Sequence, residues 1–302
     1  MTDSGQDHAG PGHTESARRD PAYVRSVLLT LCTAVTWSMS GLVWRNIEDA
    51  PIWTVIFHRS FSLFIALALI LLFRYRGRMF SACRSIGVPG LCAGFFLGSG
   101  TVLFLFAVMN TTIANVSFLT AATPMAAAIL GWWLLKERVR RATWISMIVA
   151  LLGVLVMVYE GIAEGGWFGN SMAILAALSS AGYVIALRFG RRVDQMPAVM
   201  FGGFVAFFLA MFFVTDFRIS MHDYAMCAMQ GVIISAFCNV IFAYSARSLP
   251  AAEITVLSLL EVCLAPTWVW WFLGEEPSTL ALFGGAILLT SVLAYSVSTI
   301  RS

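Results

Sequence analysis

Ten apolar stretches, each about twenty residues long and separated by short polar segments, follow one another from roughly residue 25 to residue 300. A helix needs about 20 apolar residues to cross a hydrocarbon core about 30 Å thick. Because that core offers no water to backbone groups, the spanning segments must satisfy their own hydrogen bonds, as helices do. The sequence therefore predicts an all-α membrane protein with ten transmembrane helices.

The expected spans are residues 26–45, 52–73, 86–108, 112–135, 142–159, 169–187, 197–215, 224–244, 252–273 and 279–299. Composition agrees, since 59% of the residues are hydrophobic and 12% are charged, against about 25% charged residues in soluble domains. Residues 1–24 are polar and contain no apolar signal segment, which predicts a disordered cytoplasmic tail.

The basic residues show how the chain is oriented. Of the 19 Lys and Arg residues, 16 fall on one side of the predicted bilayer, while Arg45 and Arg218 fall on the other and Arg59 lies within a span. Loops rich in Lys and Arg stay in the cytoplasm, so both termini are expected on the cytoplasmic side. The protein itself is expected in the inner membrane. This one-sided distribution also explains the net charge of +3 without a nucleic-acid partner.

Two halves of the chain share a pattern. A shift of 138 residues superimposes residues 114–137 on 252–275 and matches Trp132-Trp133 with Trp270-Trp271 and Glu137 with Glu275. Five spans per half would insert the two halves in opposite directions. The sequence thus predicts two inverted five-helix repeats, residues 25–160 and 165–302.

The chain resembles the ten-span, EamA-type members of the drug/metabolite transporter superfamily. The residues that carry the resemblance are Thr36-Trp37-Ser38, Arg59, Thr123-Pro124, Leu135-Lys136-Glu137-Arg138, Leu260-Glu261 and Phe272-Leu273-Gly274-Glu275. The resemblance covers nearly the whole chain beyond the tail, and it implies export of a small metabolite, such as an amino acid, or of an amphipathic drug. The family often has Glu-Pro in the ninth span, whereas here Val262 follows Glu261 and the proline is displaced to Pro266.

Ionisable groups inside the bilayer are the first candidates for function, because each costs about 2.5–3.5 kcal/mol to insert at mid-helix. Glu261 is expected either to carry protons and bind substrate or to form a structural pair with Arg59. Arg59 is expected to serve as that fixed partner or as a clamp for a substrate anion. His58 could change charge near neutral pH and so couple transport to protons, or remain a neutral hydrogen-bonded group.

Three uncharged residues complete the expected substrate site. Asn115 and Asn239 need hydrogen-bond partners inside the membrane, and Trp37 offers a stacking surface. Pro124 and Pro266 each free a backbone carbonyl at mid-span, which predicts bends and possible hinges, with repair of the carbonyl by a Ser or Thr hydroxyl as the simpler alternative. Glu253 is expected to stabilise a helix start.

The chain contains no nucleotide-binding loop, hydrolase motif or His/Cys metal spacing. We therefore expect a non-enzymatic secondary carrier without cofactor, metal or ATPase subunit, whose partners are a small-molecule substrate, protons and the lipid bilayer. An uncoupled facilitator is one alternative. A membrane sensor or a membrane-enzyme subunit is an alternative of a different class.

Overall fold

The computed structural model describes residues 21–137, 139–159, 166–274 and 278–301. Within these ranges the chain is helical and has no strand, as a long apolar chain without water around its backbone requires. The first twenty residues of the predicted tail lie outside the described ranges, but residues 21–24 are already helical. The first described helix, α2, thus already includes residues 21–25, ahead of the predicted start at residue 26.

The helices are α2 (Pro21–Ser38), α3 (Ser40–Arg45), α4 (Ile52–Tyr75), α5 (Met79–Ser85), α6 (Gly87–Asn110), α7 (Ile113–Thr120), α8 (Thr123–Leu135), α9 (Arg141–Val158), α10 (Trp167–Phe189), α11 (Met196–Met211), α12 (Met221–Ala228), the π-helix η2 (Met229–Ala236), α13 (Phe237–Ser245), α14 (Ala251–Ser258), α15 (Leu260–Leu273) and α16 (Thr279–Arg301).

Nine segments of the described ranges are long and apolar enough to cross a membrane. The predicted seventh span, residues 197–215, corresponds to the shorter α11, whose 16 residues end at Met211. A helix of that length reaches about 24 Å at a rise of about 1.5 Å per residue. The chain is an integral membrane protein, and α11 is shorter than the sequence predicted.

Several spans are interrupted near their middle. The first breaks at Met39 between α2 and α3, the fourth at residues 121–122 between α7 and α8, and the ninth at Leu259 between α14 and α15. The eighth remains continuous but widens into the π-helix η2, a geometry often found at functional sites. Hydropathy predicted these segments as single helices, and their interruptions bring polar groups to mid-span.

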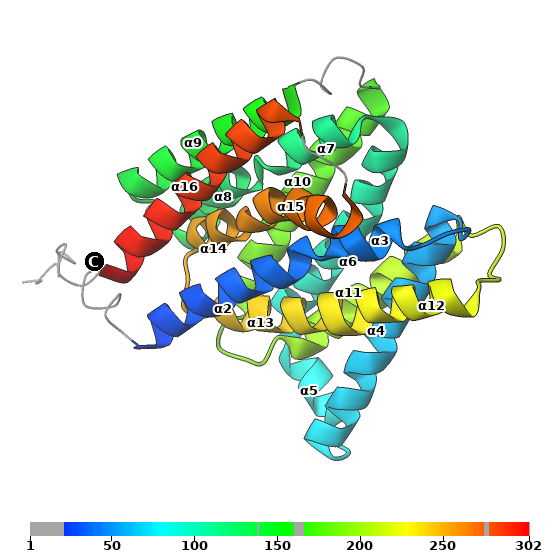
Figure 1. The fold of residues 1–302 in the computed structure, drawn as a ribbon. Coiled ribbons are helices and arrows are strands. Elements are labelled where there is room, and N and C mark those ends of the chain that lie inside the picture. The colour runs from blue at the N-terminus through cyan, green and yellow to red at the C-terminus, as the bar shows by residue number, and fades with distance from the viewer. Residues whose placement is uncertain (1–20, 138, 160–165, 275–277, 302) are drawn as a thin grey trace, which may run out of the picture.

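The breaks of the fourth and ninth spans follow the shift of 138 residues. It places Ile113–Thr120 on Ala251–Ser258 and the helix end Leu135 on Leu273. The residue after each helix end, Lys136 or Gly274, adopts a left-handed conformation, with φ of 56° and 70°. In Figure 1, α7–α8 and α14–α15 run in opposite directions. Glu275, which the sequence comparison matched with Glu137, lies outside the described residues.

Helices from the two halves pack against one another throughout the bundle. Close neighbours are α6 with α10, α2 with α13, α4 with α11, and α9 with α16, the last pair running side by side along one edge in Figure 1. If each helix is replaced by its counterpart in the other half, the pair α6–α10 becomes the pair α13–α2. The pairs α4–α11 and α9–α16 remain the same pairs. The buried core between α2, α8, α10, α13 and α14 is rich in alanine, whose small side chain lets these helices approach closely.

The contact between α9 and α16 depends on glycine. A Cβ at Gly284 would overlap the Gly153 carbonyl and the Met157 backbone, and a Cβ at Gly153 would lie 2.9 Å from the Gly284 carbonyl oxygen. The adjacent Gly285 has only Cys263 Sγ nearby, at 3.7 Å. The two helices therefore touch through backbone at Gly284 but not at Gly285.

We expect Gly284→Ala to destabilise the protein by about 1–3 kcal/mol, because α9 and α16 must move apart to admit the methyl group. Gly285→Ala is the matched control on the same helix, and it should be neutral or stabilising by up to about 1 kcal/mol, since alanine favours helix. Denaturant unfolding in detergent, followed by circular dichroism, measures both. Equal effects of the two substitutions would contradict the backbone contact.

Candidate functional site

The crossing of α4 and η2 places a charged residue at the interface of the two halves. A Cβ at Gly231 in η2 would overlap the Arg59 carbonyl oxygen of α4, so the two backbones touch there. The Arg59 side chain then reaches along η2, and its Nη2 donates to Ser235 Oγ at 2.9 Å. This contact joins residues 176 positions apart in sequence.

Arg59 does not form the predicted ion pair with Glu261. Its one hydrogen bond within the described residues is that to Ser235, and its Nε is buried without an acceptor. The structural pair was one of the two arrangements that the sequence left open, and the structure places Ser235 instead beside the guanidinium.

A polar and aromatic chain leads away from Ser235. Asn239 Nδ2 donates to the Ser235 carbonyl at 2.9 Å, and the Tyr183 hydroxyl donates to Asn239 Oδ1 at 3.4 Å. The Tyr183 ring stacks on Phe242 with centroids 6.0 Å apart, and Phe242 contacts the Trp37 ring at 5.5 Å. We call Arg59, Ser235, Asn239, Tyr183, Phe242 and Trp37 the central seam.

The central seam contains three of the predicted site residues, Trp37, Arg59 and Asn239, on helices of both halves. Sequence reasoning missed Ser235, Tyr183 and Phe242. The only local signal for Ser235 was its place four residues before Asn239, one helical turn away. Tyr183 and Phe242 are ordinary apolar-span aromatics in the sequence and gain a role only through their neighbours.

Glu261 lies beside the central seam. The helix α15 packs against α2, which carries Trp37 of the central seam, and Glu261 occupies the first turn of α15, directly after the break at Leu259. Within the described residues it makes no hydrogen bond or ion pair. The positive end of the α15 dipole favours a negative charge at this position. Because the span is broken at Leu259, the N-terminus of α15 places a partial positive charge near Glu261. A single continuous helix, as the sequence predicted, would not have this charge at mid-span.

His58 and Asn115 lie away from the central seam. His58 Nε2 is 3.0 Å from the Phe217 carbonyl oxygen, and its ring meets the Tyr224 ring edge-on. Asn115 Nδ2 donates to Thr111 Oγ1 at 3.0 Å, and Thr111 in turn donates to Asn170 Oδ1 at 2.8 Å. In the described residues, the side chains of His58 and Asn115 make no hydrogen bond to Arg59, Asn239 or Trp37.

The two mid-span prolines occur in different settings. Pro124 lies in the first turn of α8, just after the break, and the Thr120 carbonyl accepts a hydrogen bond from Thr123 Oγ1 at 2.6 Å. This is the hydroxyl repair that the sequence offered as the simpler alternative. Pro266 lies inside α15, where it removes a backbone donor without ending the helix.

Two further hydrogen bonds hold the short helix α3 against the second half. Trp268 Nε1 donates to Ser38 Oγ at 2.8 Å, and Gln230 Nε2 donates to Ser40 Oγ at 3.0 Å. Ser38 and Ser40 flank the break of the first span. Trp268 thus joins α15 to this break.

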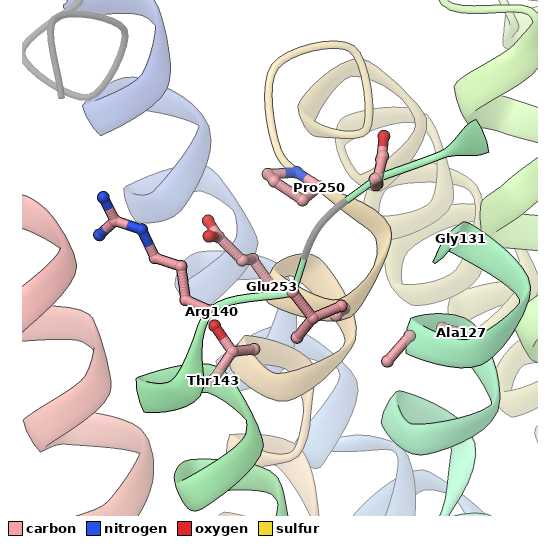
Figure 2. A pocket seen from close by; sticks show the side chains of 10 residues that line it. Ala127, Gly131, Arg140, Thr143, Pro250 and Glu253 are labelled. Atoms are coloured by element: carbon pink, nitrogen blue, oxygen red, sulfur yellow. The ribbon is translucent and has the colours of Figure 1, made fainter. Parts of the chain in front are cut away.

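A pocket lies at the start of α14, the end of this helix that is farther from the break at Leu259. Figure 2 shows Ala127 and Gly131 of α8, Arg140 and Thr143 at the start of α9, and Pro250 and Glu253 around it. Glu253 is buried in the first turn of α14 and accepts a hydrogen bond from the Tyr23 hydroxyl. It thus lies at a helix start, as predicted.

Glu137 also lines this pocket and joins three helices. Its Oε1 accepts hydrogen bonds from Arg188 of α10, with Nε at 2.8 Å, and its Oε2 accepts from the Ala251 N–H at 3.1 Å. Arg188 Nη1 also donates to the Ala246 carbonyl at 3.1 Å. The ends of α8, α10 and α14 are therefore fastened at one point.

The apolar spans, the interrupted helices and the polar seam between the halves define a polytopic membrane protein of the transporter class. The sequence matches the EamA-like transporter family twice, over residues 24–159 and 167–297. The chain belongs to the EamA-like transporter family.

Relatives and solved structures agree with this assignment. The chain is 24% identical to the pseudopaline exporter CntI of Pseudomonas aeruginosa over 277 residues, which cover 89% of this chain and 95% of that protein. It is 29% identical to protein RarD of Salmonella typhi over 156 residues, half of each chain. A crystal structure of a protein with 17% identity superimposes with a TM-score of 0.71 over 92% of this chain and 98% of that one, which supports the fold.

Proposed function

We propose that this protein is a secondary active transporter of the inner membrane that exports a small metabolite, such as an amino acid, or an amphipathic drug. The observation that carries the proposal is the central seam, because it joins both halves through polar groups that a purely structural membrane core would not need. The similarity to CntI, a pseudopaline exporter, supports export. Both termini lie in the cytoplasm in this proposal, on the side of the basic loops.

The transport mechanism that fits this architecture is alternating access by two inverted five-helix repeats. The double family match, the equal helix breaks 138 residues apart and the opposite directions of α7–α8 and α14–α15 support such repeats. The repeats would rock about the seam, with the breaks at residues 121–122 and 259 as bending points. Pro124 and Pro266 are the hinge candidates.

The substrate site in this proposal is formed by Trp37, Arg59, Asn239 and Glu261. Glu261 is the candidate proton carrier, because its carboxylate lies inside a span, beside the seam, without a cationic partner in the described residues. His58 and Asn115 belong to outer parts of the path, where the substrate would enter or leave. An uncoupled facilitator remains the second candidate, favoured if Glu261 never exchanges its proton.

If Glu261 couples transport to protons, Glu261→Gln should impair proton-driven accumulation and leave exchange without a gradient intact. The variant cannot release a proton, so accumulation driven by a proton gradient in proteoliposomes should fall at least about tenfold, a change of about 1.4 kcal/mol. Exchange of labelled for unlabelled substrate without a gradient should persist. The experiment starts with counterflow of candidate metabolites, since flux through the purified chain also separates a carrier from a sensor or an enzyme subunit.

Glu253→Gln is the matched control, a buried carboxylate in the first turn of the other helix of the same span. It should keep the response to the gradient, because Glu253 lies outside the central seam. A Glu261→Gln variant that accumulates substrate as the wild type does would remove Glu261 from the coupling mechanism.

A further inference from the structure

We propose that Arg59 binds a carboxylate of the transported molecule, so that the substrates of this protein are small monoanionic or zwitterionic carboxylates. This inference rests on the proposed transport function and names the chemical class of its substrate. The Arg59 side chain is partly exposed, while its Nε atom is fully buried.

The Arg59 guanidinium is left largely unsatisfied. Arginine has five N–H donors, and in the described residues only Nη2 has an acceptor, Ser235 Oγ at 2.9 Å. Nε is buried without any acceptor. Because an unmade hydrogen bond of a buried charged group is costly, native proteins retain one mainly where a ligand, ion or water completes it.

No carboxylate of the described chain neutralises Arg59. The carboxylates in ion pairs there are Glu137, Asp194 and Asp223, and Arg59 is not among their basic partners. One positive charge inside the membrane thus lacks a fixed counter-charge.

The surroundings of Arg59 suit an oxyanion. Its planar fork matches the two oxygens of a carboxylate, and such charge-assisted pairs are shorter and stronger than neutral hydrogen bonds. Ser235, held by the wide turn of η2, lies beside it and keeps its hydroxyl hydrogen free of any acceptor in the described residues. Asn239 and the stacked rings of Tyr183 and Phe242 continue from this point.

Charge balance favours a carboxylate over a phosphate. Arg59 is the one basic residue that the sequence places inside a span, so the proposed site offers a single positive charge, with the Glu261 carboxyl as its one acidic group. A carboxylate carries one negative charge and is neutralised by it. A phosphomonoester, which carries about 1.5 to 2 negative charges at pH 7, would keep an excess charge inside the membrane.

The experiment uses matched sets of labelled compounds in counterflow with the purified full chain in liposomes. Each set contains a monocarboxylate or amino acid, its amide, and the amine without the carboxylate. We expect wild-type uptake of the carboxylate to exceed that of the amide and the amine at least about tenfold. Arg59→Gln should remove this preference, while Arg59→Lys, which keeps the charge but not the planar fork, should retain part of it.

Two controls separate binding from folding. Arg84→Gln changes an exposed arginine outside the spans and should leave the preference unchanged. Ser235→Ala keeps Arg59 and should lower the preference by a smaller factor. If Arg59 only tied α4 to η2, Arg59→Gln would lower stability and leave the ratio of carboxylate to amine uptake intact, and that result would overturn the proposal.

A second measurement keeps the inference separate from the transport function. If no compound moves, the proposed function fails, and thermal stabilisation of the detergent-purified protein by the same compounds then decides the inference. Stabilisation by carboxylates that is lost in Arg59→Gln supports a carboxylate site. The absence of such stabilisation, or preferential binding of a phosphomonoester, overturns it.

Discussion

Removing the Glu137 carboxylate is expected to destabilise the protein by about 3–5 kcal/mol, the range found when one partner of a buried ion pair is lost. Arg188 is only 7% exposed and its partner Glu137 19%, so Glu137→Ala would leave a buried guanidinium with only backbone carbonyls around it. The substitution also removes the acceptor of the Ala251 N–H at the start of α14. Denaturant unfolding of the detergent-solubilised protein measures the loss.

Two further variants test whether burial is the reason. Replacing both partners, Glu137→Met with Arg188→Met, should recover much of the stability, because no charge is then left unpaired. Arg74→Gln breaks the Arg74–Asp194 pair, whose side chains are 60% and 32% exposed, and should cost at most about 1 kcal/mol. A loss for Glu137→Ala as small as that for Arg74→Gln would contradict the structural role of the pair.

The second large effect is expected at Asp223, on the side of the molecule away from the basic loops. Its side chain is 1% exposed; Oδ1 accepts the Glu48 N–H at 3.1 Å and Oδ2 accepts the Asp49 N–H at 3.3 Å. This carboxylate therefore holds the loop between α3 and α4 against the start of α12. Asp223→Ala should cost about 2–4 kcal/mol, because two charge-assisted hydrogen bonds are lost together.

The controls for Asp223 lie in the same loop. Glu48→Ala and Asp49→Ala change exposed side chains but keep the backbone N–H groups that Asp223 binds, so each should stay within about 0.5 kcal/mol of the wild type. Asp223→Asn keeps one acceptor oxygen and should fall between Asp223→Ala and the wild type. Hydrogen exchange of the Glu48 and Asp49 amides gives a direct reading, and protection unchanged in Asp223→Ala would refute the contact.

Much of the fold could be predicted because hydropathy is a local property. A run of apolar residues long enough to cross the bilayer must form a helix there, whatever its neighbours are. The main departures are the short α11 and the breaks at Met39, residues 121–122 and Leu259. At residues 121–122 the Thr123 hydroxyl, beside Pro124, compensates the interrupted backbone. Such compensation does not change the hydropathy of the segment.

The candidate site was less predictable because it depends on how helices rotate and cross. The cost of an ionisable group in a bilayer identified Arg59 and Glu261 as exceptional residues. It could not show that Arg59 contacts Ser235 rather than Glu261, since that contact is made by the backbone approach at Gly231 and the π-helix. Asn115 and His58 met the same sequence criterion and lie elsewhere.

The sequence alone determined that the chain is a helical membrane protein, indicated which loops carry its basic residues and carried the resemblance to its family, because these follow from composition and order along the chain. Only the tertiary structure decided which polar groups meet: Arg59 with Ser235, Glu137 with Arg188, and Asp223 with the α3–α4 loop. These contacts join residues tens to hundreds of positions apart, and their geometry is set by the packing of all the helices together.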